Sequence, residues 1–126
     1  MNQILVVDGE PDMAATYERL LRRSGHRVVL AATRADGMQF LERLRPRLVI
    51  SDLRLPDGDG LDVIRAAGGF AAAPAVIAIT AFASRAARQS ALDAGARAFL
   101  AKPFAIDELS RLVERLIQHP AAPTAT

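Results

Sequence analysis

The sequence predicts an α/β protein with a doubly wound five-stranded parallel sheet that carries helices on both faces. Three observations support this fold class. Five short apolar segments, rich in branched residues, fit strands that are buried on both faces. A segment with helical periodicity follows each of them, which is typical of parallel strands joined by right-handed helical crossovers. The 126 residues contain no internal linker, so we expect a single domain.

The five strands are expected where apolar residues run without interruption. The first is the run QILVV at 3–7, and the others are expected at 26–31, 47–52, 75–80 and 97–101. The second strand carries no polar functional group at its end, as expected of a strand at the edge of the sheet.

Cap and stop residues mark the limits of the first two predicted helices. The first is expected over 13–24, because Gly25 stands at the usual stop position. Thr33 is the expected N-cap of the second, and Asp36, three residues later, completes an approximate capping box. Pro46 ends that helix.

Three more helices are expected at 61–67, 84–95 and 106–117. Glycines close the first two of these, and Ser84 is the expected N-cap of the second. The segment 55–60, LPDGDG, is dense in turn residues.

Composition and charge exclude several classes of protein. Apolar residues make up 51% of the chain, and no apolar run approaches the ~18–20 residues that a membrane span needs. The net charge of +2 is too balanced to predict nucleic-acid binding. There are no cysteines and no secretory signal pattern, so we expect a cytoplasmic protein that does not bind a membrane. We expect the domain over 1–118 and a disordered tail over 119–126, HPAAPTAT.

Polar side chains gather at the ends of four predicted strands. Asp8, with Glu10 close behind, follows the first strand, and Asp52 ends the third. Thr80 ends the fourth, and Lys102, the single lysine of the chain, follows the fifth. Because parallel strands point their carboxyl ends the same way, we expect these groups to meet at one edge of the sheet, where ligands bind in such folds.

The residue types at this edge indicate phosphoryl chemistry. Clustered carboxylates repel each other, and a divalent cation with oxygen ligands, such as Mg²⁺, relieves that cost. A carboxylate beside a cation, a hydroxyl and an ammonium can act as a nucleophile toward a phosphoryl group. Taken singly, each residue has an ordinary explanation as a turn former, a β-former or a solvated charge. Their joint placement at the ends of four strands of one sheet favours a functional site.

Four stretches of sequence together resemble the receiver domain of two-component response regulators, the CheY-like family. They are ILVVDGEPD, LVISDLRLPDGDGLDVI, VIAITAFA and AGARAFLAKPF, and the resemblance spans roughly residues 2 to 118. It implies the flavodoxin-like strand order 2-1-3-4-5. It also implies a signalling switch rather than an enzyme, one that catalyses only its own phosphorylation and dephosphorylation.

The resemblance assigns a role to each strand-end residue. Asp52 would accept the phosphoryl group, and Thr80 and Lys102 would contact it. Asp8 and Asp52 would hold Mg²⁺, Asp8 through water. The backbone carbonyl of Arg54 would be a direct metal ligand, and Glu10 is a candidate further ligand.

The resemblance also implies a conformational switch. Phe99 matches the aromatic switch position, and its rotamer would follow Thr80. Pro103 would follow a cis peptide bond. Arg54 and Phe82 lie where the family tunes the lifetime of the phosphate.

Gly9 departs from the family pattern, which usually has a second metal-binding acid at this position. Three explanations remain open. Glu10 or Asp12 replaces the missing ligand, or a water fills the gap at lower metal affinity, or the protein is a pseudo-receiver that signals without phosphate. The retention of Asp52, Thr80 and Lys102 favours working phosphorylation with weakened Mg²⁺ binding.

The expected partners are a sensor histidine kinase or phosphotransfer protein and a downstream protein target, with the chain a monomer or a phosphorylation-dependent dimer. The expected output surface comprises the fourth helix, fifth strand and fifth helix, with Arg85, Arg88, Gln89, Arg97, Arg111 and Arg115. One alternative is an interaction module of the same fold that ignores phosphate. A small phosphatase with an aspartyl nucleophile is a weaker alternative, because the chain has no cap domain to enclose a substrate.

Overall fold

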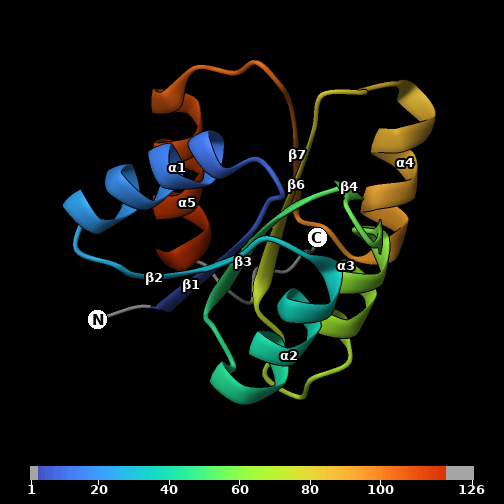
Figure 1. Cartoon of the computed structure of the whole chain (residues 1–126), viewed down its shortest axis with the longest axis horizontal. Coiled ribbons are helices and arrows are strands. Elements are labelled where there is room, and N and C mark those ends of the chain that lie inside the picture. The colour runs from blue at the N-terminus through green and yellow to red at the C-terminus, as the bar shows by residue number, and fades with distance from the viewer. Residues whose placement is uncertain (1–2, 119–126) are drawn as a thin grey trace.

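The computed structural model describes residues 3–118, and Figure 1 shows how they are arranged. All strands of the main sheet are parallel and run in the order β2-β1-β3-β6-β7. They are β1 (Gln3–Val7), β2 (Arg27–Ala31), β3 (Leu48–Asp52), β6 (Ala75–Thr80) and β7 (Ala98–Ala101). The helices are α1 (Pro11–Arg23), α2 (Arg34–Leu44), α3 (Leu61–Gly68), α4 (Arg85–Ala94) and α5 (Ile106–Gln118). Because β4 (Arg54–Leu55) and β5 (Gly58–Asp59) form a separate two-stranded sheet, β6 and β7 are the fourth and fifth strands of the main sheet. The predicted fold class and the predicted strand order 2-1-3-4-5 are therefore confirmed.

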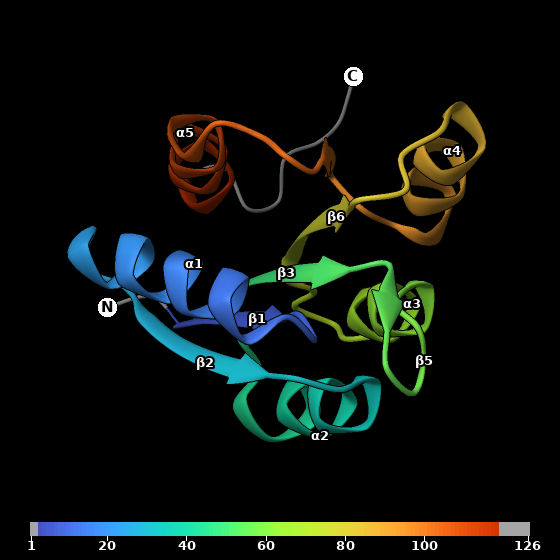
Figure 2. The same cartoon turned by 45° about the horizontal axis from the view of Figure 1, so that its top comes forward.

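Helices cover both faces of the sheet, as Figure 2 shows. Helices α1 and α5 pack on one face, and α2, α3 and α4 pack on the other. The side chains of β1 alternate between the two cores, because successive residues of a strand point to opposite faces. Ile4 and Val6 join the core under α1 and α5, whereas Leu5 and Val7 join the opposite one.

The burial of each strand follows its place in the sheet. Every residue of β3 and β6 is buried, which explains why their sequences are continuous apolar runs up to the polar last residues. Strand β2 lies at the edge of the sheet, as predicted, and its residues show mixed burial. No helix among residues 3–118 is both long and apolar enough to cross a membrane.

The predicted N-cap residues lie at the starts of α2 and α4. The Thr33 hydroxyl accepts a hydrogen bond from the Asp36 amide, and the Ser84 hydroxyl accepts one from the Ala87 amide. Helix α2 ends one residue before Arg45, which takes a left-handed conformation and precedes Pro46. The predicted tail, 119–126, lies outside the described residues, and so do residues 1 and 2 of the predicted domain.

The predicted turn at 55–60 overlaps a small antiparallel hairpin, formed by β4 (Arg54–Leu55) and β5 (Gly58–Asp59). Asp57, at its tip, accepts hydrogen bonds from the backbone amides of Arg34 and Ala35 at the start of α2. These amides lower the pKa of the Asp57 carboxyl. Strands of two residues are too short to show an alternating pattern, so sequence periodicity does not detect this hairpin.

Gly60 returns the chain from the hairpin to α3 in close contact with the end of β3. Its amide donates a 2.9 Å hydrogen bond to the Leu53 carbonyl. A Cβ atom at this position would overlap the backbone carbonyl of Asp52. Because the obstacle is backbone, a side chain here must displace the segment that positions Asp52.

We therefore expect Gly60→Ala to lower the free energy of unfolding by about 2 kcal/mol or more, in the range of overpacked cores. Urea denaturation measures the loss. Gly68→Ala is the matched control, because a Cβ at Gly68 meets nothing within 4 Å and the residue is helical. That variant is expected to gain up to about 1 kcal/mol from helix propensity. Equal stability of the two variants would contradict the close approach at Gly60.

Candidate functional site

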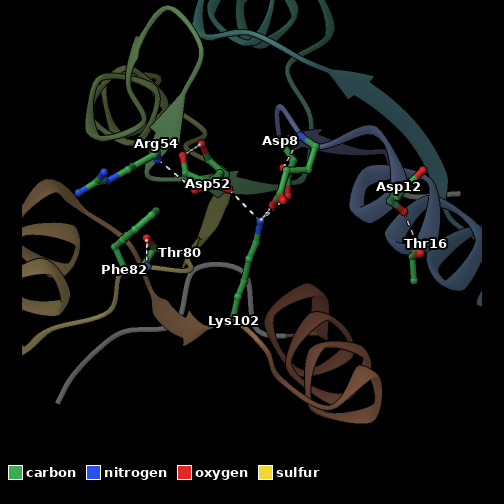
Figure 3. A network of polar contacts seen from close by, with 10 residues as sticks. Asp8, Asp12, Thr16, Asp52, Arg54, Thr80, Phe82 and Lys102 are labelled. Atoms are coloured by element: carbon green, nitrogen blue, oxygen red, sulfur yellow. Dashed lines mark hydrogen bonds and ion pairs between the residues drawn. The ribbon is translucent and has the colours of Figure 1, made fainter.

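Four strand ends meet at one edge of the sheet, as the sequence predicts. Asp8 directly follows β1, Asp52 is the last residue of β3, and Thr80 is the last residue of β6. Lys102 directly follows β7. The parallel register holds these ends level, with Val7 opposite Ser51 and Asp52 opposite Ile79. In Figure 3 the Lys102 side chain extends from its strand to a point between Asp8 and Asp52.

The Lys102 ammonium contacts three carboxylates. Its Nζ lies 2.9 Å from Asp52 Oδ2, 3.1 Å from Asp8 Oδ2 and 2.8 Å from Glu10 Oε1. The side chains of Lys102, Asp8 and Asp52 are 7%, 0% and 9% exposed, whereas that of Glu10 is 63% exposed. Two of the three ion pairs are therefore shielded from solvent, and the third lies at the mouth of the site.

Burial and ion pairing act in opposite directions on this cluster. Burial alone would lower the pKa of Lys102, but its hydrogen bonds to Glu10, Asp52 and Asp8 outweigh burial and raise it. Lys102 therefore stays protonated at neutral pH. Burial raises the pKa of Asp8, although the Glu10 amide and Lys102 oppose the increase. Burial in the folded protein thus disfavours the ionised form of Asp8.

The three carboxylates form a donor set that suits Mg²⁺. One oxygen each from Asp8, Glu10 and Asp52 lies within 4.8 Å of the others. Hard cations of this size prefer oxygen ligands and keep several waters, so three acids suffice for a partly hydrated ion. A cation at this position would compete with the Lys102 ammonium for the same oxygens.

Asp12, the other proposed substitute for the missing acid, lies away from the cluster. Its backbone carbonyl accepts a hydrogen bond from the Thr16 hydroxyl within α1, and Figure 3 shows both residues lying apart from the group around Lys102. Among the described residues, the group of acids that is close enough to share a metal includes Glu10 but not Asp12. The geometry therefore favours Glu10 over Asp12 as the substitute.

Gly9 lies against Pro56. A Cβ atom at Gly9 would come within 2.9 Å of Pro56 Cδ and 3.0 Å of Pro56 Cγ. The space in which a second acid would begin is thus closed by the proline ring. Pro56 was not among the site residues predicted from the sequence, because a proline in a turn has an ordinary structural explanation.

A second group of side chains borders the site beside Asp52. Asp52 Oδ1 accepts a hydrogen bond from the Arg54 amide, and Thr80 Oγ1 accepts one from the Phe82 amide, both 3.0 Å long. The Arg54 guanidinium lies 3.9 Å from the centroid of the Phe82 ring, in a cation–π contact. Asp8, Asp52, Arg54 and Phe82 together line one cleft of about 370 Å³. Arg54 and Phe82 thus flank the approach to Asp52.

Phe99 lies away from this cleft. It is half-buried on β7, contacts the core under α2, α3 and α4, and lines a separate groove with α4 and α5. The peptide bond between Lys102 and Pro103 is cis, as predicted.

Tyr17 is a neighbour of the site that the sequence does not reveal. It lies on α1, is fully buried and stacks on Phe104 with 5.8 Å between ring centroids. Burial raises the pKa of its hydroxyl to about 12, and the charges of Lys102 and Asp8 also act on it. The hydroxyl has no hydrogen-bond partner among the described residues. Its helical spacing predicts a core residue, so no sequence signal distinguishes it from an ordinary apolar position.

The chain matches the response regulator receiver domain family over residues 4–114. Because this match covers most of the 126 residues, the chain belongs to that family. It is a receiver domain of the type found in two-component signalling, as the resemblance implied.

Among curated proteins, the KDP operon transcriptional regulatory protein KdpE of Escherichia coli K12 is 36% identical over 125 residues, which are 99% of this chain and 55% of that protein. KdpE of Mycobacterium tuberculosis is 37% identical over 123 residues, or 97% of this chain and 54% of that protein. The chain thus spans about half the length of both. An uncharacterized 14.6 kDa protein of Leptolyngbya boryana is 37% identical and is matched over 87% of its length, with 89% of this chain aligned.

Solved structures agree with the fold. The signal receiver domain of a LuxO repressor protein from Vibrio parahaemolyticus superimposes with a TM-score of 0.87 at 30% identity, covering 93% of this chain and 90% of that one. A CheY-like receiver domain from Methanospirillum hungatei gives a TM-score of 0.89 at 26% identity, covering 94% of each chain.

We expect Asp8→Asn to raise the thermal midpoint of the metal-free protein at pH 7 by a few degrees. The ionised Asp8 carboxylate costs the folded state free energy because burial raises its pKa, and asparagine can still accept the Glu10 amide. The cost is present above the raised pKa and vanishes as the pH falls below the ordinary aspartate value of about 3.9. The increase in thermal midpoint of Asp8→Asn over the wild type should therefore shrink as the pH is lowered.

Calorimetry in a chelator over a pH series measures this gain. Asp12→Asn is the matched control, since Asp12 is an exposed acid in the first turn of α1 and should lose slightly from the helix dipole. An Asp8→Asn protein less stable than the wild type at neutral pH would show that the contact with Lys102 outweighs the cost of burial.

Proposed function

We propose that the chain is a phosphoacceptor switch that takes a phosphoryl group onto Asp52. The observation that carries the proposal is the 2.9 Å contact between Lys102 Nζ and Asp52 Oδ2 within a cluster of three acids. This contact joins the ends of two strands that are far apart in the sequence. It places an ammonium where the oxygens of an incoming phosphoryl group need a counter-charge.

In the proposed transfer, a carboxylate oxygen of Asp52 forms a bond to phosphorus as the phosphorus–nitrogen bond of a phosphohistidine breaks. The donor imidazole leaves with the electron pair. The Arg54 amide holds one oxygen of Asp52 and Lys102 holds the other, so the carboxylate is fixed before the donor arrives. A bound Mg²⁺ would neutralise charge on the transferring oxygens.

Thr80 is proposed to contact the phosphoryl group and to report its presence. Its hydroxyl accepts the Phe82 amide but still has its own proton to donate. A phosphoryl oxygen at Asp52 would draw this hydroxyl inward, and Phe99 would move in response. A charged group that biases one of two packed arrangements is the usual basis of such switches.

Arg54 and Phe82 are proposed to set the lifetime of the phosphoryl group. Their stacked side chains flank the cleft over Asp52 and restrict the approach of water. Truncation of the Phe82 ring should therefore speed hydrolysis several-fold. Phe70→Ala is a matched control, because Phe70 stacks with Arg45 in a cation–π contact of the same kind whose residues do not line this cleft.

The proposed partners are a histidine kinase or phosphotransfer protein and a downstream protein target. The proposed output surface is the face formed by α4, β7 and α5, which Phe99 helps to line. The alternative function, a constitutive interaction module, is favoured by one observation: Gly9 removes an acid, and Pro56 fills the space next to it.

We expect acetyl phosphate with Mg²⁺ to modify the wild-type protein and to leave Asp52→Asn unmodified. Intact-mass spectrometry detects the mass of one phosphoryl group, and time points after removal of the donor give the lifetime for the wild type, Phe82→Ala and Phe70→Ala. If no Mg²⁺ concentration produces an Asp52-dependent adduct, phosphorylation is excluded and the constitutive module remains. Turnover of a small phosphoester would instead support the alternative that the chain is a phosphatase.

We expect Glu10→Gln to weaken Mg²⁺ binding by about tenfold, because it removes one of the three anionic ligands that Gly9 leaves available. The rise in thermal midpoint with Mg²⁺ concentration measures the affinity without any phosphorylation. Asp12→Asn is the control and should bind as the wild type does. If Glu10→Gln binds Mg²⁺ as tightly as the wild type does, Glu10 is not a ligand, and a water molecule takes the place of the missing acid.

The same titration tests Gly9→Asp. Restoring the second acid should tighten Mg²⁺ binding only if the Pro56 ring can move aside. The double change of Gly9→Asp with Pro56→Ala removes the obstacle and should give the larger increase.

A further inference from the structure

Tyr17 carries a polar group that the surrounding core does not use. Its side chain is fully buried, in the same apolar cluster as Ile4, Val6 and Leu109. Among the buried side-chain nitrogen and oxygen atoms of residues 3–118, the Tyr17 hydroxyl oxygen is the one that forms no hydrogen bond. An unpaired buried hydroxyl costs free energy that phenylalanine, with nearly the same shape, would not. Packing alone therefore does not account for a tyrosine at this position.

The direction of α1 brings this hydroxyl toward the acid cluster. Helix α1 begins directly after Glu10, so its first turn lies at the end of the sheet that carries the cluster. Helical side chains tilt toward the N-terminus of their own helix, so the Tyr17 ring leans toward that end. The ring stacks on Phe104, which is two residues beyond Lys102 in the sequence. The hydroxyl is therefore held on the inner side of the site.

The charges of the site act on this hydroxyl. Burial has the largest influence on the pKa of the Tyr17 hydroxyl and raises it, and the charge of Lys102 has the next largest and lowers it. The carboxylates of Asp8, Asp52 and Glu10 also raise this pKa. Within the described part of the chain, the hydroxyl forms no hydrogen bond with any of these groups. It thus lies in the field of the Lys102 ammonium without being bonded to it.

The Lys102 ammonium has no donor to spare in this structure. An ammonium has three N–H groups, and those of Lys102 point to Asp8, Glu10 and Asp52. Oxygens of the same three carboxylates form the donor set that suits Mg²⁺. A cation at that set would take these acceptors and repel the ammonium. Because its side chain is only 7% exposed, Lys102 would then need another buried acceptor.

The Tyr17 hydroxyl can supply that acceptor. A phenol oxygen accepts hydrogen bonds, and a bond from a charged donor is stronger than one between neutral groups. The other buried hydroxyls near the strand ends, those of Ser51 and Thr80, each take part in a hydrogen bond already. A bond between Lys102 and Tyr17 would therefore satisfy both the displaced ammonium and the unpaired hydroxyl.

We propose that Tyr17 is a positioning residue for Lys102: its hydroxyl oxygen accepts a hydrogen bond from the ammonium when a divalent cation occupies the carboxylates of Asp8, Glu10 and Asp52. The inference rests on the proposed function for its purpose. An ammonium held by one N–H group keeps the other two for the oxygens of an incoming phosphoryl group. Because the phenol is neutral, it holds the lysine inside the site without offering the cation another anionic ligand.

The first test is spectroscopic. The chain contains one tyrosine and no tryptophan, so its tyrosine spectrum reports on Tyr17 alone. The Fermi doublet in the Raman spectrum of a phenol distinguishes a hydroxyl that accepts a hydrogen bond from one that donates or is unbonded. We expect the unbonded form in a chelator and the accepting form in saturating Mg²⁺. A doublet that does not change with Mg²⁺ would overturn the proposal, and so would a change to the donating form, which would assign Tyr17 to a carboxylate.

The second test is Tyr17→Phe, which removes the hydroxyl and keeps the ring. We expect the thermal midpoint of the metal-free protein to rise by a few degrees, because an unpaired buried hydroxyl is lost. Mg²⁺ binding should weaken roughly three- to tenfold, because the bound state loses a hydrogen bond. The rise in thermal midpoint with Mg²⁺ concentration measures that affinity.

Thr16→Val is the matched control. It removes the hydroxyl of the adjacent residue, which donates to the Asp12 carbonyl within α1, and should bind Mg²⁺ as the wild type does. A purely structural role for the Tyr17 hydroxyl would shift the thermal midpoint equally at every Mg²⁺ concentration. That result, or equal Mg²⁺ affinity in Tyr17→Phe and the wild type, contradicts the proposal.

Both tests use Mg²⁺ alone, which separates this inference from the proposed function. If the doublet responds to Mg²⁺ while acetyl phosphate gives no Asp52 adduct, Tyr17 positions Lys102 and the phosphoacceptor function fails. If the adduct forms equally fast in the wild type and Tyr17→Phe and the doublet is unchanged, the function stands and this inference fails. Where both hold, we expect adduct formation at saturating Mg²⁺ to be several-fold slower in Tyr17→Phe than in Thr16→Val.

Discussion

One ammonium group balancing three carboxylates is the interaction on which the site depends. Lys102 contacts Asp8, Glu10 and Asp52, and the parallel sheet is what brings these residues within reach of it. Removing Lys102 would leave the buried carboxylates of Asp8 and Asp52 without a counter-charge, which costs more than the ion pairs themselves are worth. The strand order, the level strand ends and the closely packed return at Gly60 all serve to hold this arrangement.

The same charge balance bears on Gly9, where the family pattern has a second acid. A missing acid reduces the repulsion among the carboxylates, which a single cation then balances more easily. Pro56 occupies the neighbouring space, and Glu10 approaches from the exposed side instead. The third acid of the cluster is thus Glu10, whose side chain is far more exposed than those of Asp8 and Asp52.

Much of this structure could be predicted from the sequence, because strong local signals agree with one another. Continuous apolar runs identify buried strands, and Thr33 and Ser84 identify helix starts through their hydroxyls. The meeting of Asp8, Asp52 and Lys102 follows from parallel topology alone. The hairpin at Arg54–Asp59, the contact of Pro56 with Gly9 and the closeness of Tyr17 to the site could not be predicted. They arise from short strands, ring packing and burial, which leave no periodic signal.

The solitary lysine makes the site chemically distinguishable from the rest of the surface. Every other basic side chain apart from the two histidines is an arginine, so reagents that acylate side-chain amines have one target. That amine is protonated and shielded by its three carboxylates, and both conditions suppress its nucleophilicity. A ligand that draws those carboxylates away would expose it. The rate of acylation is therefore an intrinsic reporter of occupancy that requires no added label.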